Sequence, residues 1–193
     1  MKNIVAIYGG HRRGYNSDVA LDYLLDTMKS KELNIKRLYL TNMDIKPCKA
    51  CNSCFKDGKC IINDEMQNVY GYFEEADIVL TSTPIYFNTL SSRLKILIER
   101  CQSIWSGKYV AGKSPISRKK RTGCAICVSG SNMADKDFEC VIKVLDMFYK
   151  CINAKLTDKI FIPNTDELPV DKRPELIIKI ADIGKGLIEN SRG

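Results

Sequence analysis

Short apolar runs alternate with segments of helical periodicity along most of the chain. The first run, Lys2–Tyr8, ends in two glycines and predicts a buried parallel strand. A helix should follow, because Asn16 or Ser17 can serve as its N-cap. Its apolar positions recur at helical spacing: Val19, Ala20, Leu24, Leu25 and Met28.

The same alternation predicts four further strand–helix units. Strands are expected at residues 34–40, 77–82 and 124–129, and a fifth strand should include residues 159–162. Helices are expected over residues 64–75, 91–105, 135–150 and 174–189. Five such units imply an α/β fold with a parallel, doubly wound sheet, because right-handed crossovers place helices on both faces.

The length and composition favour a single globular domain over residues 1–193. The nine cysteines are too few for a small disulfide-stapled secreted protein, and the apolar run at the N-terminus is too short for a signal sequence or a membrane span. We therefore expect a cytoplasmic protein with reduced thiols and no membrane segment.

The net charge is +7, and part of it comes from a basic cluster formed by Lys113, Arg118, Lys119, Lys120 and Arg121. This cluster suits either a docking patch for an acidic redox partner or an ordinary solvated loop. No nucleic-acid recognition motif accompanies the charge, so nucleic-acid binding is not expected.

Three loops leave predicted strands at the edge where such sheets bind ligands. Residues 9–17 (GGHRRGYNS) lead into a helix N-terminus, whose amides and Ser17 hydroxyl suit a phosphate. The spacing is neither G-x-G-x-x-G nor a Walker P-loop, which disfavours a dinucleotide or a triphosphate here. Residues 83–89 (TPIYFNT) supply a proline and two aromatic rings, and residues 129–133 (SGSNM) form the third loop. A monophosphate site beside a site for a planar ring fits FMN.

Four cysteines are crowded into one short segment, residues 47–61. Cys48, Cys51, Cys54 and Cys60 have the spacing C-x2-C-x2-C-x5-C, which favours an iron–sulfur cluster. A zinc site of four thiolates and a set of free or transiently oxidised thiols remain alternatives. The other five cysteines are expected in the core: Cys101, Cys124, Cys127, Cys140 and Cys151.

The chain resembles the NAD(P)H-dependent FMN reductase superfamily, and within it most closely the iron–sulfur flavoproteins. The phosphate loop keeps Gly9, Arg12, Asn16 and Ser17 of the family pattern, with His11 in place of the usual proline. Pro84-Ile85-Tyr86 and the SRLKILIER segment match the second motif, and the cysteine spacing matches the third. The resemblance implies a flavodoxin-like, three-layer α/β/α sandwich with a five-stranded parallel sheet of order 2-1-3-4-5.

The resemblance also implies a cofactor-borne redox function without a catalytic side chain. A [4Fe–4S] cluster on the four cysteines would exchange electrons with FMN, fed by a ferredoxin-like donor, in a homo-oligomer (dimer or tetramer). The residues expected to bind FMN are Gly10, His11, Arg12, Asn16, Ser17, Pro84, Ile85, Tyr86, Phe87, Asn88, Ser129 and Gly130.

Two other functions remain open at this point. One is a cluster-free FMN or quinone reductase that uses NAD(P)H as reductant, and the other is a non-enzymatic module that binds zinc or senses thiol oxidation. The sequence leaves two single residues undecided as well. His11 suits either a contact to the cofactor or an exposed loop position, and Trp105 suits either a subunit interface or the active site.

Overall fold

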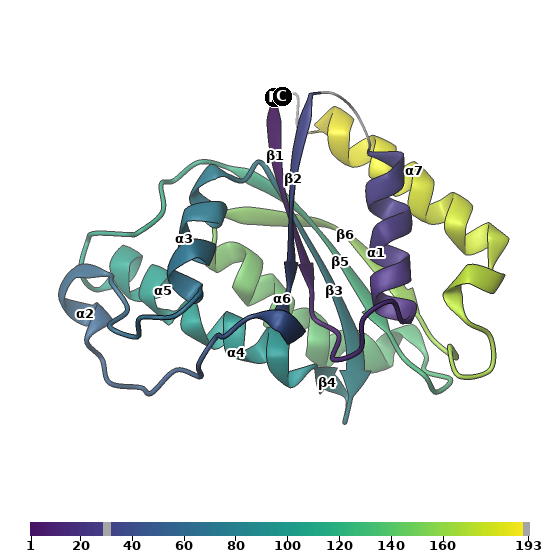
Figure 1. The fold of residues 1–193 in the computed structure, drawn as a ribbon, viewed down its shortest axis with the longest axis horizontal. Helices are drawn as coiled ribbons and strands as arrows, with labels where there is room; N and C mark the ends of the chain where they lie inside the picture. Colours follow the sequence, from purple (N-terminus) through teal and green to yellow (C-terminus); the bar gives the residue numbers. More distant parts are fainter. Residues whose placement is uncertain (29–31, 191–193) are drawn as a thin grey trace.

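The computed structural model describes residues 1–28 and 32–190. Residues 29–31 and 191–193 belong to the predicted domain 1–193 but lie outside the described residues. One sheet runs through the middle of the molecule with helices on both of its faces (Figure 1).

Five parallel strands form the sheet: β1 (Lys2–Tyr8), β2 (Leu33–Tyr39), β3 (Ile78–Tyr86), β5 (Arg121–Val128) and β6 (Ala154–Ile162). Their spatial order is β2-β1-β3-β5-β6, which is 2-1-3-4-5 when only the parallel strands are numbered. The predicted α/β class and strand order are therefore confirmed. The sequence analysis missed a sixth, two-residue strand, β4 (Thr89–Leu90), which pairs antiparallel with the end of β3.

Two apolar cores lie on the two faces of the sheet. Alternation along β1 sends Ile4, Ala6 and Tyr8 to one face, and Val5 and Ile7 to the other. The first face is covered by α1 (Asn16–Thr27) and α7 (Pro174–Asn190). The second face is covered by α3 (Met66–Glu75), α4 (Ser92–Arg100), α5 (Gln102–Tyr109) and α6 (Glu139–Cys151).

The remaining elements are short. They are α2 (Cys54–Asp57) and three 3-10 helices, η1 (Leu40–Asn42), η2 (Asp135–Phe138) and η3 (Val170–Lys172). Within the described residues, no helix combines the length and the apolar character needed to cross a membrane.

The structure corrects several predicted boundaries. The single helix expected over residues 91–105 is two helices, because the backbone of Cys101 (φ −67°, ψ −2°) interrupts it between α4 and α5. The strand expected to end at residue 82 continues to Tyr86, so the second ligand loop is mostly strand. Asn16 and Ser17 are the first two residues of α1, and Tyr15 takes the N-cap position without a side-chain hydrogen bond.

The structure also contradicts two predictions of side-chain exposure. Cys140 is exposed rather than buried, whereas the other four cysteines outside residues 47–61 are buried as expected. Arg121 is only 3% exposed and does not belong to a basic surface patch. Its guanidinium donates to the carbonyls of Phe73 and Glu74 in α3 and of Ile152 after α6, which satisfies acceptors at two helix ends.

Candidate functional site

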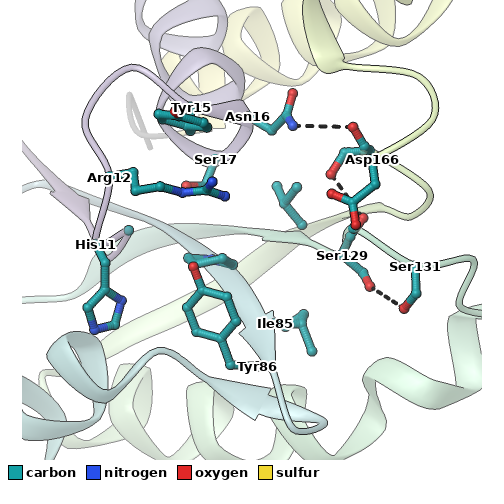
Figure 2. A pocket seen from close by; sticks show the side chains of 15 residues that line it. His11, Arg12, Tyr15, Asn16, Ser17, Ile85, Tyr86, Ser129, Ser131 and Asp166 are labelled. Atoms are coloured by element: carbon teal, nitrogen blue, oxygen red, sulfur yellow. Dashed lines mark hydrogen bonds between the residues drawn. The ribbon is translucent and has the colours of Figure 1, made fainter.

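A cavity of about 380 Å³ opens at the carboxyl ends of the parallel strands. Its walls come from the loops after β1, β5 and β6 and from the end of β3 (Figure 2). This strand-end cavity lies where the strand order reverses between β1 and β3, the place at which doubly wound sheets bind ligands.

One end of the strand-end cavity is suited to an anion. It is formed by the N-terminus of α1, where backbone N–H groups lack helical partners and the helix dipole is positive. Ser17, in the first turn, lines the cavity. The Arg12 guanidinium packs 4.0 Å from the centre of the Tyr15 ring, and Figure 2 shows it extending into the cavity.

A buried carboxyl lies beneath this anion site. Asp18 is 2% exposed; one of its oxygens accepts from the Gly14 N–H at 3.0 Å, and the other has no partner in the described residues. Burial raises the pKa of the Asp18 carboxyl, against the opposing effect of the Gly14 and Arg13 contacts. The loop therefore holds an acid that is costly to ionise close to where an anion would sit.

The opposite wall is made by two loops that hydrogen-bond to each other. Thr165, after β6, donates to the Ser129 carbonyl through both its backbone N–H and its hydroxyl, each at 3.0 Å. Asn16 joins this wall to α1, because its Nδ2 donates to the Thr165 carbonyl at 3.5 Å, and its Oδ1 accepts from the Val170 N–H in η3 at 2.9 Å. At Gly130 an added Cβ would lie 2.4 Å from a carboxylate oxygen of Asp166, so the two loops pack closely at this point.

The remaining wall carries aromatic and apolar groups. Tyr86 ends β3, and its ring centroid lies 5.7 Å from that of His11 (Figure 2). The His11 ring is held by a 3.1 Å hydrogen bond between its Nε2 and the Ser92 hydroxyl at the start of α4. Pro84 and Ile85 complete this wall, which suits a planar ring.

Phe87 and Asn88 lie outside the lining of the strand-end cavity, although both were predicted to contact the flavin. They are the two central residues of the turn between β3 and β4, with φ values of +49° and +58°. This turn directs Phe87 into solvent, where it is fully exposed. All the other residues predicted to bind FMN line the cavity.

Sequence reasoning missed five lining residues: Tyr15, Val128, Ser131, Thr165 and Asp166. The loop after β6 has no glycine-rich motif, so composition gave no indication of it. Its position in the fold was the usable signal, because every loop at the carboxyl edge of a parallel sheet can reach the same site.

A second, much smaller cavity of about 30 Å³ is lined by all four clustered cysteines. Residues 47–61, the cysteine segment, enclose this cysteine cavity and pack through α2 against α5. Ala50 and Asn52 adopt φ values of +50° and +58°, which lets the backbone turn sharply on either side of Cys51.

Gly58 fixes the position of the segment on the protein. Its φ of +76° ends α2, and an added Cβ would lie 2.1 Å from the Lys113 carbonyl oxygen. No other residue type fits a left-handed conformation with backbone so close.

Polar groups already approach two of the thiols. The Cys54 Sγ lies 3.4 Å from the Ser106 hydroxyl, which accepts at 3.1 Å from the Gln102 amide. The Cys54 thiol donates to the Ser106 hydroxyl, and a deprotonated Cys54 would instead accept the Ser106 hydroxyl proton. Hydrogen bonds from the Ser53 side chain and backbone lower the pKa of the Cys51 thiol.

The donor set of the cysteine cavity is four thiols, a set that suits an iron–sulfur cluster or a zinc ion. Among residues 1–28 and 32–190, no three His, Cys, Asp or Glu side chains come together closely enough to hold one metal ion. In a four-iron cluster each thiolate binds a different iron, so the sulfurs stand farther apart than around one zinc ion. All four thiols line the one cysteine cavity.

The two cavities are separate within one chain. They share no lining residue, and α2 lies well away from the carboxyl ends of β1 and β3 in Figure 1. The cysteine cavity is therefore not part of the strand-end cavity of the same chain. Trp105, on α5, lines neither cavity; it is 38% exposed and packs on Tyr109.

Solved structures with the same fold include reductases by their titles. An FMN-dependent NADH-azoreductase from Bacillus anthracis superposes with a TM-score of 0.71 at 15% identity, covering 96% of this chain and 99% of that one. A flavone reductase gives a TM-score of 0.71 at 17% identity, covering 98% of this chain and 63% of that one. These likenesses confirm the flavodoxin-like fold.

Sequence relatives are named iron–sulfur flavoproteins. The one from Methanosarcina thermophila is 27% identical over 128 residues, which is 66% of this chain and 63% of the relative. One from Methanocaldococcus jannaschii is 31% identical over 122 residues, 63% of this chain and 59% of the relative. The matches thus span less than two thirds of the length of either relative.

The family model described as NADPH-dependent FMN reductase matches residues 2–136, well over half of the 193 residues. The matched region contains the β1 and β3 walls of the strand-end cavity and the whole cysteine segment. The resemblance predicted from the sequence is confirmed, and the chain belongs to the NADPH-dependent FMN reductase family of flavin-dependent oxidoreductases.

Proposed function

We propose that the strand-end cavity binds FMN and that the cysteine segment holds a [4Fe–4S] cluster that exchanges single electrons with it. The observation that carries the proposal is that all four cysteines of the segment line one cavity. The names of the sequence relatives support the same cofactor pair.

In the strand-end cavity, the chain's residues would bind and orient the cofactor. The N-terminus of α1, Ser17 and Arg12 would hold the phosphate, whose charge the helix dipole favours. Tyr86 and His11 would flank the isoalloxazine ring, with His11 positioned by Ser92. FMN, when bound, supplies hydride or single-electron chemistry, so no side chain needs to act as an acid or base.

In the cysteine cavity, Cys48, Cys51, Cys54 and Cys60 would be the ligands. Ser106 would donate a hydrogen bond to the Cys54 sulfur, because a thiolate that binds iron has no proton of its own to donate. Ser53 would favour the thiolate of Cys51, which is the form that binds iron.

Separation of the two cavities within one chain favours electron exchange between subunits of a homo-oligomer. A ferredoxin-like donor would supply the electrons. Lys113, Arg118 and Lys120 form the exposed basic region for docking such an acidic protein. Arg121, because it is buried, would take no part in docking.

A second candidate function is a cluster-free reductase that takes hydride from NAD(P)H. The family description favours it, since it names NADPH as reductant. The open strand-end cavity, flanked by the exposed Tyr86 ring, leaves room for a nicotinamide to approach the flavin.

Anaerobic purification followed by assay of FMN, iron, acid-labile sulfide and zinc separates these candidates. The proposal predicts about four irons and four sulfides with one FMN per chain. FMN without iron after anaerobic reconstitution, with rapid bleaching of the flavin by NADPH, would replace it with the second candidate.

A matched pair of variants assigns the ligands. Cys54→Ser should lose iron while retaining FMN, and Cys140→Ser should retain both, because Cys140 is exposed and far from the cysteine segment in sequence. Full iron content in Cys54→Ser would contradict the ligand assignment.

A further inference from the structure

A single buried side chain, Arg100, holds both ends of the cysteine segment. Its Nη1 donates to the Lys46 carbonyl at 2.7 Å, before the first cysteine. Its Nη2 donates to the Ile62 carbonyl at 3.4 Å, after the last cysteine. The last residue of α4 thus closes the loop that carries all four thiols.

The charge of Arg100 is balanced by Asp64 in a buried, bidentate pair. The two hydrogen bonds measure 2.6 and 3.0 Å, and both side chains are fully buried. Burial raises the pKa of the Asp64 carboxyl, but the hydrogen bonds from Arg100 and from the Lys46 and Met66 backbone N–H groups, together with the Arg100 charge, lower it below its ordinary value. Asp64 is therefore ionised, and the pair is neutral as a whole.

One N–H group of Arg100 has no hydrogen-bond acceptor among the described residues. Its Nε–H is buried and has no hydrogen-bond partner in the described residues, whereas its Nη atoms make four hydrogen bonds. An unsatisfied buried N–H is destabilising and uncommon, so such a donor indicates a missing acceptor. Arg100 lines the cysteine cavity, where the sulfur atoms of a cluster would lie.

We propose that Arg100 is a positioning residue for the cluster: its Nη atoms hold the cysteine segment closed, and its Nε–H donates a hydrogen bond to a cluster sulfur. This inference rests on the proposed [4Fe–4S] cluster. Reduction adds negative charge to the cluster, which strengthens a hydrogen bond to its sulfur, so the donor raises the reduction potential. Neither the family pattern nor the cysteine spacing assigns this role to Arg100.

Two variants remove the Nε–H without changing the net charge of the pair. Arg100→Lys keeps the positive charge, and Arg100→Met combined with Asp64→Asn removes both charges together. A buried ion pair replaced as a unit is often tolerated, so the double variant remains informative if Arg100→Lys fails to fold. Arg93→Lys, on the same helix, is the matched control.

The measurement is the midpoint potential of the reconstituted cluster, followed by its electron paramagnetic resonance signal. Both Arg100 variants should bind FMN normally and disfavour cluster reduction about tenfold, which is about 59 mV for a one-electron couple. The reduced wild-type protein should show coupling to an exchangeable proton that disappears in D₂O and in both variants, and Arg93→Lys should match the wild type.

The possible failures are distinguishable. A wild-type protein that takes up no iron contradicts the proposed function, and the Nε–sulfur bond with it. A wild-type cluster whose potential and proton coupling are unchanged in both Arg100 variants contradicts this inference alone. The role of Arg100 in holding the cysteine segment closed can be tested in the iron-free protein. Alkylation of Cys48 and Cys60 should be faster in the Arg100 variants than in the wild type. Equal alkylation rates would exclude this role.

Discussion

The strand-end cavity is lined by residues at the ends of four parallel strands, whereas the cysteine cavity is enclosed by a segment with one short helix. Each wall of the first is held by the hydrogen bonds of a sheet and by loop-to-loop bonds such as Thr165 to Ser129. The cysteine cavity depends on the hydrogen bonds of Arg100 and on the close packing of Gly58 against the Lys113 carbonyl. Changes at these two residues should therefore affect the cysteine cavity without affecting the strand-end cavity.

Gly58→Ala should have the largest effect, and it should fall on the cysteine cavity alone. A left-handed alanine costs about 1–2 kcal/mol. The new methyl group would also collide with the Lys113 carbonyl, and such overpacking adds about 1–3 kcal/mol. Iron retention should fall severalfold while FMN content stays at one per chain, as measured by anaerobic cofactor assay.

Gly186→Ala is the matched control for Gly58→Ala. Gly186 lies in α7 with nothing within 4 Å of an added Cβ, so this change should leave iron content intact. Loss of FMN together with iron in Gly58→Ala would show that the two cavities are not independently built.

Tyr86→Ala tests the strand-end cavity. Loss of a ring that flanks the flavin should weaken FMN binding by about 1–2 kcal/mol, roughly tenfold in Kd, while iron content is unchanged. Fluorescence titration of the iron-free protein with FMN measures the change. Tyr109→Ala removes an exposed ring outside both cavities and should bind FMN normally; equal affinities in the two variants would contradict the ring site.

Asp18→Asn should change how stability depends on pH. Below the ordinary pKa of aspartate, about 3.9, the Asp18 carboxyl is neutral in both the folded and the unfolded chain. Because burial raises its pKa in the folded state, the unfolded chain ionises first as the pH rises, and the wild-type protein loses stability up to the folded pKa. The asparagine variant has no such loss.

Urea unfolding of the FMN-free protein between about pH 3 and pH 7 measures this difference, because that range begins below the ordinary aspartate pKa of about 3.9. The wild type should lose stability relative to Asp18→Asn as the pH rises. Asp171→Asn, at an exposed position, is the control and should follow the wild type. A difference that stays constant with pH would show that Asp18 is not the group responsible.

The alternation of strands and helices and most of the strand-end cavity could be predicted from local patterns in the sequence, whereas the strand order was implied by the family resemblance. Apolar runs, helical periodicity and glycine-rich loops are each readable within about ten residues. Thr165 was missed because its role comes from contact between two distant loops. Arg100 was missed although it had a signal: it lies three residues after Leu97 on the buried face of α4, and a charged residue there needs a buried partner.

Phe87→Asn should have the smallest effect of these variants on stability and cofactor binding, and it tests whether Phe87 lies outside the strand-end cavity when FMN is bound. Phe87 has a left-handed backbone (φ +49°) and a fully exposed ring, so asparagine should relieve about 1 kcal/mol of strain without losing buried area. Thermal unfolding should show a modest rise in Tm, while Phe87→Leu, which keeps the unsuited backbone, should not. FMN affinity should be unchanged in both variants, because the β3–β4 turn directs Phe87 away from the cavity. A loss of FMN affinity in both would mean that the turn reorients when the cofactor binds, and would return Phe87 to the set of flavin contacts predicted from the sequence.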